Sequence, residues 1–168
     1  MLMGIDFSIL TDIMHGLYGG GKMALLKKSI DSNANFINEF RESCLEVGRI
    51  IGESGIFVRP FASDDLSIFA SLDLSKKKEA LDRLNIYKKI CNSTVVSGRG
   101  VADSKTHIWY AIQAFGLRPT SDLFNYIEDG HVVEIHDPMG IQIFRNSEFY
   151  KFSSYSIEEF YCCPWADL

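Results

Sequence analysis

The chain has 168 residues, of which 46% are hydrophobic and 12% aromatic, and this composition supplies a buried core and excludes general disorder. Its formal net charge of -5 argues against a nonspecific nucleic-acid surface, because phosphate contacts require a basic patch. No stretch approaches the roughly 20 apolar residues of a membrane span, and the N-terminus lacks the pattern of a secretory leader. We therefore expect one folded cytoplasmic domain that contacts neither nucleic acid nor membrane directly.

The four cysteines show neither the spacing of a zinc site nor that of a disulfide framework. We expect them to be reduced thiols that lie mostly in the core. They are Cys44, Cys91, Cys162 and Cys163.

The first expected element is a short amphipathic helix over residues 5–14, which ends at a glycine-rich segment. Gly16, Gly21 and Lys22 have the spacing of a phosphate-binding loop, but Met23 stands where a Ser or Thr would bind magnesium. The preceding residues mix polar with apolar side chains, unlike the buried strand that such a loop follows. We interpret the segment as a hinge and keep Gly16, Gly21 and Lys22 as weak phosphate-loop candidates.

Apolar residues recur every three or four positions between residues 34 and 52, which predicts a helix with one buried stripe. Asp31, Ser32 or Asn33 can cap its start, and Gly55 lies just beyond its end. We expect this helix to carry a homodimer contact, and packing within the monomer is the alternative. The stripe consists of Phe36, Ile37, Phe40, Cys44, Val47 and Ile51.

Four further helical segments follow. A short helix is expected after the capping residues 63–65, and a long one begins near Ser75 with a second apolar stripe. Residues 93–100 are interpreted as a linker, with a short strand at residues 95–96 as an option. Asp103 or Ser104 then caps a helix that Gly116 ends, and residues 120–127 form a short helical turn.

After Gly130 the hydrophobic period changes from about 3.6 to 2, which predicts a β-hairpin that pairs residues 131–136 with 141–145. Asp137, Pro138 and Gly140 favour the turn between these strands. The chain is thus expected to be α+β, with a mainly helical part over residues 1–127 and a hairpin plus helices over residues 128–168.

Eight positions near the C-terminus fit one pattern: Asp137, Gly140, Asn146, Phe149, Tyr155, Ser156, Glu158 and Glu159. On these positions, residues 132–160 resemble the opening half of a PAS sensory domain. In that family a strand ends in Asp and a turn with Gly, and a second strand runs to Asn. A helical segment then leads to a Gly-Tyr-Ser-x-Glu-Glu run. In this chain Ser154 stands at the position of the glycine of that run. The resemblance implies a five-stranded antiparallel sheet, with the later strands beyond Leu168, and a signal-input function.

Candidate ligand-pocket residues are the aromatic side chains Trp109, Phe144, Phe149, Phe152 and Tyr155. We find no catalytic motif such as G-x-S-x-G and no metal site, because the polar residues of the hairpin divide between its two faces.

We therefore expect a non-catalytic signal-input domain of a bacterial-type signalling or transcription-regulatory protein. It would bind a ligand or partner, form a homodimer and act on an output domain beyond Leu168. Two alternatives remain open: a small-molecule or nucleotide-binding enzyme that uses the loop over residues 16–22, and a structural interaction module without a ligand.

Overall fold

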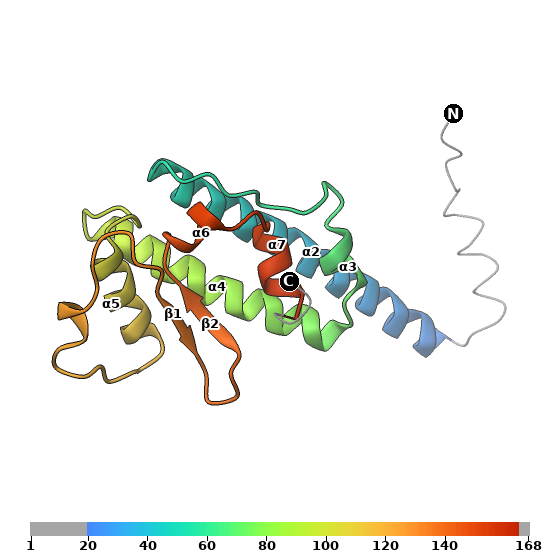
Figure 1. The fold of residues 1–168 in the computed structure, drawn as a ribbon. Helices are drawn as coiled ribbons and strands as arrows, with labels where there is room; N and C mark the ends of the chain where they lie inside the picture. Colours follow the sequence, from blue (N-terminus) through green and yellow to red (C-terminus); the bar gives the residue numbers. More distant parts are fainter. Residues whose placement is uncertain (1–19, 165–168) are drawn as a thin grey trace. The chain divides into compact units, whose positions relative to one another are not determined.

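The computed structural model describes the backbone of residues 20–164 and the side chains of residues 33–164. Of the described residues, 37–164 belong to one unit and 20–36 to another. The helix expected over residues 5–14 lies outside the described residues. The described elements are α2 (Gly20–Glu53), α3 (Ser67–Ser71), α4 (Leu74–Val96), α5 (Ser104–Ala114), the 3-10 turn η1 (Leu123–Asn125), β1 (Glu134–His136), β2 (Gln142–Arg145), α6 (Phe149–Phe152) and α7 (Ile157–Cys162) (Figure 1).

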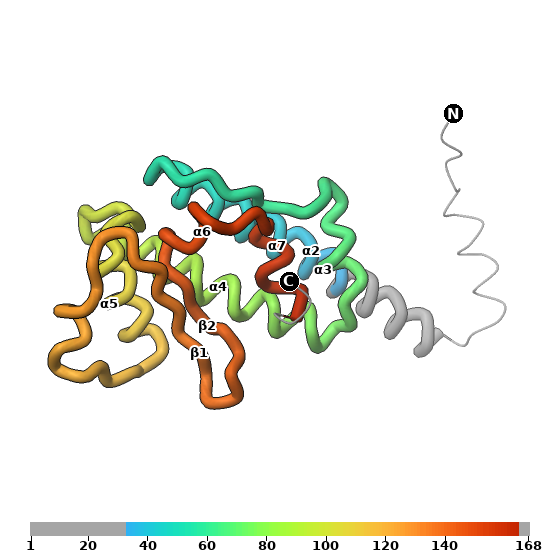
Figure 2. Tube along the Cα trace, in the orientation of Figure 1, coloured from blue at the N-terminus to red at the C-terminus, as the bar shows by residue number. Residues whose placement is uncertain are grey.

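Helix α4 packs against several of the other elements. It contacts α5 and α7 directly, and its fully buried Tyr87 lies 5.9 Å from the ring of Phe144 in β2. The path of the chain in Figure 2 shows α7, formed near the C-terminus, returning to the side of the much earlier α3. The mainly helical fold with a small antiparallel sheet confirms the expected α+β class.

Helix α2 begins earlier than the sequence suggested. It starts at Gly20, so Asp31 and Asn33 lie inside the helix and the predicted start near residue 34 is wrong. The segment over residues 22–30 is rich in Ala, Leu, Met and Lys, which favour helix strongly enough to extend it through the polar residues that follow.

The apolar stripe of α2 packs within the monomer. Four of its six members have no exposed surface: Phe40, Cys44, Val47 and Ile51. Phe40 stacks on Phe69 of α3, with ring centroids 4.0 Å apart. Within the described side chains, the interior of the chain therefore already uses most of the face that we expected to carry a dimer contact.

Helix α4 continues through residues 93–96, the first part of the segment interpreted as a linker. Val95 and Val96 end the helix and form no strand, so that expectation is wrong. Thr94 is buried, and its hydroxyl donates a hydrogen bond to the Ile90 carbonyl, so this polar side chain has a partner inside the helix. Gly98, with φ of +80°, follows the last turn and ends it.

The predicted hairpin is present, but its strands are shorter than expected. Asn146 holds the backbone before β1 with its side chain and its main chain. Its Oδ1 accepts from Val133 N at 3.0 Å, its Nδ2 donates to the His131 carbonyl at 2.8 Å, and its backbone N donates to the Val133 carbonyl at 3.0 Å. At the tip, Asp137 Oδ1 accepts from the backbone amides of Met139 and Ile141, each at 2.9 Å. These bonds fix the turn that the sequence predicted.

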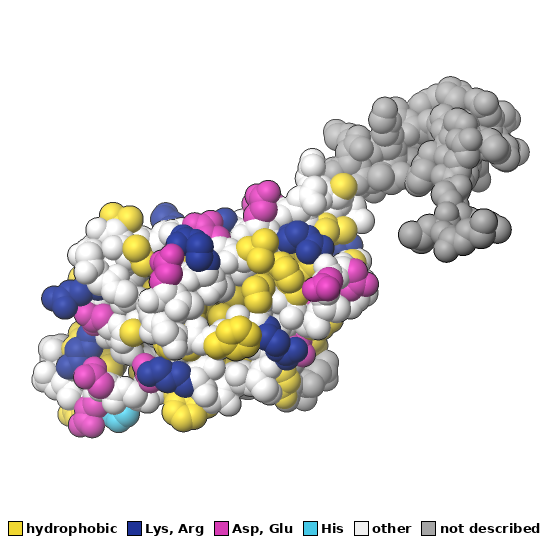
Figure 3. Space-filling model, turned by 90° about the horizontal axis from the view of Figure 1, so that it is seen from above, with side chains coloured by type: hydrophobic (Ala, Val, Ile, Leu, Met, Phe, Trp, Pro, Cys, Tyr) yellow, Lys and Arg dark blue, Asp and Glu magenta, His cyan; other side chains and the backbone are white. Residues whose placement is uncertain are grey.

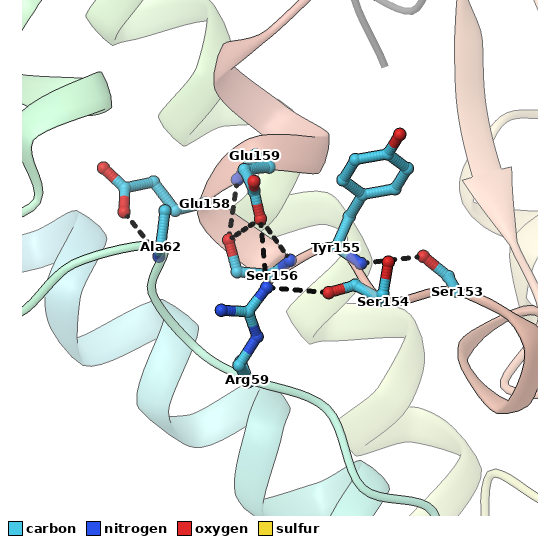
Figure 4. A network of polar contacts seen from close by, with 8 residues as sticks. All are labelled: Arg59, Ala62, Ser153, Ser154, Tyr155, Ser156, Glu158 and Glu159. Carbon is cyan, nitrogen blue, oxygen red and sulfur yellow. Dashed lines mark hydrogen bonds and ion pairs between the residues drawn. The ribbon is translucent and has the colours of Figure 1, made fainter.

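The start of α7 is fixed to the loop before α3 by the contacts drawn in Figure 4. Ser156 and Glu159 form a capping box at the start of α7. The amides of Ile157 and Glu158 donate to the carbonyls of Arg59 and Pro60 at 2.9 and 3.1 Å. These two bonds attach the first turn of α7 to the backbone of residues 59 and 60.

Candidate ligand-binding site

A pocket of about 410 Å³ lies where α4, β2 and the C-terminal end of α7 meet. Its lining comes from residues 72–83, 140–145 and 160–164. The deepest of these side chains, Arg145, Phe160 and Tyr161, are buried, whereas Lys76 and Ile141 are exposed. A volume of this size lies in the range that holds small organic ligands.

Arg145 is the central polar residue of this pocket. Only 4% of it is exposed, and its guanidinium carbon lies 3.9 Å from the centroid of the Phe160 ring. Phe149 and Tyr161 flank it at 5.2 and 5.8 Å. Its Nη1 atom is shielded from solvent and has no hydrogen-bond partner within the described chain. Arg145 is thus a buried cation stabilised by aromatic faces and lacking an anion.

A bulge in the hairpin brings Gln142 to the same pocket. Ile135 pairs with Phe144, whereas the next residue of β1 pairs with Gln142, so Ile143 is the extra residue of the bulge. In a regular strand, Gln142 and Arg145 would point to opposite faces, and one inserted residue reverses this relationship. Both residues line the pocket, and neither amide atom of Gln142 has a hydrogen-bond partner within the described chain.

Arg83 of α4 connects the pocket to the end of α7. Its Nη2 donates to the carbonyl of Tyr161 at 3.0 Å, while its Nε is buried without a partner. The pocket lining therefore contains three basic side chains, Lys76, Arg83 and Arg145, against the single carboxylate of Glu79. This charge balance favours an anionic ligand over a cationic one.

The Cys162 thiol and the Tyr161 phenol, which both line the pocket, stay protonated near neutral pH. Burial raises the pKa of Cys162, and the nearby Glu158 raises it further. Burial likewise raises the pKa of Tyr161 well above its usual range, although Arg145 lowers it in part. Neither group is an activated nucleophile, because a reactive cysteine needs a lowered pKa.

The five aromatic pocket candidates from the sequence lie in different surroundings, and the pocket described above has other residues as its lining. Phe144 is buried beside His107 and Tyr87. Phe149 and Tyr155 each pack edge to face with Phe160, so they lie behind the pocket wall. The two remaining candidates are more exposed: Trp109, against Phe124, and Phe152.

The candidates for a phosphate loop are described only in part. Gly16 lies outside the described residues, and Gly21 and Lys22 lie in the first turn of α2. Nothing described places a partner for phosphate binding beside them.

The residues that carry the PAS resemblance have definite structural roles. Asp137 and Gly140, the latter with φ of +80°, form the hairpin turn, and Asn146 holds the backbone before β1. Ser156 caps α7 and Glu158 bonds to the backbone of other segments. These roles explain why each residue type stands at its position without identifying a fold family.

The polar residues of the pocket were missed by sequence reasoning. Gln142 and Arg145 stand in a strand whose simple alternation places them on opposite faces. The available signal was Arg145 itself, a cation within the apolar stretch that ends at Asn146. Arg83 gave no such signal, because it stands in a helix with many other charges.

No helix in residues 20–164 is long and apolar enough to cross a membrane. Comparison with family models, curated proteins and solved structures finds no match to this chain.

Proposed function

We propose that the chain is a non-catalytic signal-input domain of a signalling or transcription-regulatory protein, and that its signal is a small molecule bound in the pocket between α4, β2 and α7. The observation that carries this proposal is the convergence of Arg145 and Gln142, both with unpartnered buried polar atoms, on one pocket. Buried polar groups in folded proteins are nearly always hydrogen bonded, so two residues with unpartnered buried polar atoms in one pocket favour a ligand-binding role.

The pocket is built from elements that can transmit a change. A ligand there contacts the hairpin on one side and the end of α7 on the other. The start of α7 is bonded to residues 59–62 and to α3. A shift of α7 would therefore move these segments together, and we propose that it also acts on an output domain that follows Leu168.

The proposal includes a cytoplasmic location and a homodimer. The four cysteines are free, as a reducing compartment requires. The face shown in Figure 3 has apolar side chains gathered between charged ones, which fits a contact surface. Phe57 and Phe152, respectively 83% and 76% exposed, are large apolar residues available outside the buried stripe of α2.

The test is a thermal-shift screen of the purified chain against small molecules of varied charge, repeated on two variants of the hairpin tip. Ile141→Trp fills the pocket at a lining position, and Met139→Trp is its matched control at an exposed position outside the lining. We expect compounds that raise the melting temperature of the wild type and the control but not of Ile141→Trp. A screen without stabilising compounds, or hits that Ile141→Trp retains, would overturn the proposal.

A further inference from the structure

We propose that the ligand of this pocket is a small organic anion, whose carboxylate or phosphate head is held by Arg145 and Gln142 and whose apolar body packs on the aromatic wall. This inference rests on the proposed function, since it names the chemical class of the ligand for the same pocket.

The first support is a buried charge without a counter-ion. Burying a guanidinium is costly unless an anion pairs with it, and no carboxylate of the described residues forms an ion pair with Arg145. Glu134 stands opposite Arg145 in the hairpin register but pairs with His136 at 3.3 Å. The buried Glu148 pairs with Lys151 at 2.7 Å. The anion that Arg145 lacks must therefore come from outside these residues.

The second support is the orientation that stacking imposes. Phe160 lies against the guanidinium of Arg145, so the N–H groups at the edge of the planar group remain available as donors. A carboxylate or phosphate can accept two of these bonds at once. The Gln142 amide adds a further donor from the same strand. Because Nη1 and the Gln142 amide are shielded in the free protein, we expect their side chains to rotate toward the bound head group.

The third support is the chemistry of the remaining wall. Leu72, Ile141 and Phe160 are apolar, and Tyr161 presents a second aromatic side chain. Inorganic anions alone would leave this apolar surface in contact with water. A pocket of about 410 Å³ has room for a ring or a short branched chain attached to the anionic head.

The experiment measures binding by fluorine NMR with three probes of one shape: 4-fluorobenzoate, 4-fluorophenyl phosphate and the neutral 4-fluorobenzamide. We expect one or both anions to bind the wild-type chain at least tenfold more tightly than the amide. The two anionic arms distinguish a carboxylate ligand from a phosphate ligand. Ile141→Trp, which fills the pocket, should abolish anion binding.

Variants assign the binding to the two residues. Arg145→Met should weaken anion binding by about 10 to 100-fold, the effect of losing hydrogen bonds to a charged partner. Arg145→Lys should recover only part of it, because lysine lacks the planar fork. Gln142→Leu provides a second, independent variant and should weaken binding several-fold. Arg118→Gln, an exposed arginine outside the lining, should bind like the wild type.

The outcomes separate this inference from the proposed function. If the neutral amide binds as tightly as the anions and Ile141→Trp still blocks it, the pocket takes ligands but the anion inference is wrong. Undiminished anion binding in both Arg145→Met and Gln142→Leu would also overturn it. If neither the probes nor the wider screen gives any binding that Ile141→Trp blocks, the proposed function fails as well.

Discussion

The carboxylate of Glu158 in α7 accepts a hydrogen bond from the backbone amide of Phe69 in α3, with Oε1 and N separated by 3.0 Å. Its other oxygen accepts from the amide of Ala62 at 3.0 Å, and the side chain has no exposed surface. One acidic residue therefore satisfies two backbone donors on a separate segment of the chain. This connection makes the position of α7 depend on α3 and on the loop before it.

Glu158→Gln should lower the free energy of unfolding by about 2 kcal/mol, because an amide nitrogen would then face a backbone donor that has lost its acceptor. Urea denaturation followed by circular dichroism measures this difference. Glu128→Gln is the matched control, since its side chain is 79% exposed. A change below about 0.5 kcal/mol in Glu158→Gln, the range of ordinary surface substitutions, would contradict the role assigned to this carboxylate.

His107 should make the stability depend on pH. Burial lowers its pKa to about 3 from an ordinary value of 6.5. As pH falls below 6.5 the unfolded chain takes up this proton while the folded chain does not, so stability present above that pH is progressively lost down to about pH 3.

Each pH unit below 6.5 should cost the wild type about 1.4 kcal/mol of unfolding free energy through this histidine. Between about pH 7.5 and 5, His107→Gln should therefore lose roughly 2 kcal/mol less unfolding free energy than the wild type. Denaturant titrations of both proteins at the two pH values provide the measurement. The other histidines are common to both, so they cancel. An equal loss in wild type and variant would show that folding does not lower the pKa of His107.

Two glycines of α2 should respond in opposite directions to substitution. A Cβ at Gly48 would lie 3.3 Å from Cγ of Pro60, whereas one at Gly52 would meet no atom within 4 Å. Gly48→Leu should therefore destabilise the fold by more than about 2 kcal/mol through overpacking. Gly52→Ala should stabilise it by about 0.5 to 1 kcal/mol, because alanine favours helix. Melting temperatures check both, and a stabilised Gly48→Leu would show that α2 is more distant from Pro60.

The turn of the hairpin should affect ligand affinity through Asp137. Asp137 does not line the pocket, but it bonds to the backbone next to Gln142. Asp137→Ala should weaken binding of 4-fluorobenzoate several-fold while the far-ultraviolet spectrum stays unchanged. Asp129→Ala, in a preceding loop, is the control. Unaltered affinity in Asp137→Ala would mean that the turn does not position the binding residues.

Features that depend on neighbouring residues could be predicted from the sequence. The capping box of Ser156 and Glu159 is a spacing of three, and the hairpin turn needs only Asp137 and Gly140. The start of α2 was predicted wrongly because helix propensity and capping compete locally, and here the favourable residues before Asp31 extend the helix.

The pocket could not be predicted in this way. It joins residues of α4, β2 and α7 that are separated by up to about ninety positions, and only packing brings them together. The bulge at Ile143 also reverses the side-chain alternation on which strand interpretation depends. Gln142 and Arg145 consequently line the same pocket, although regular strand alternation would place them on opposite faces.

The most direct measurement is a crystal structure of the chain grown with 4-bromobenzoate, or with 4-bromophenyl phosphate if only the phosphate probe binds, with the bromine located by its anomalous signal. Our account predicts a bromine peak against the apolar wall at Ile141 and Phe160, and the anionic head group within hydrogen-bond distance of Arg145. Bromine bound elsewhere, or a head group directed away from Arg145, would contradict it.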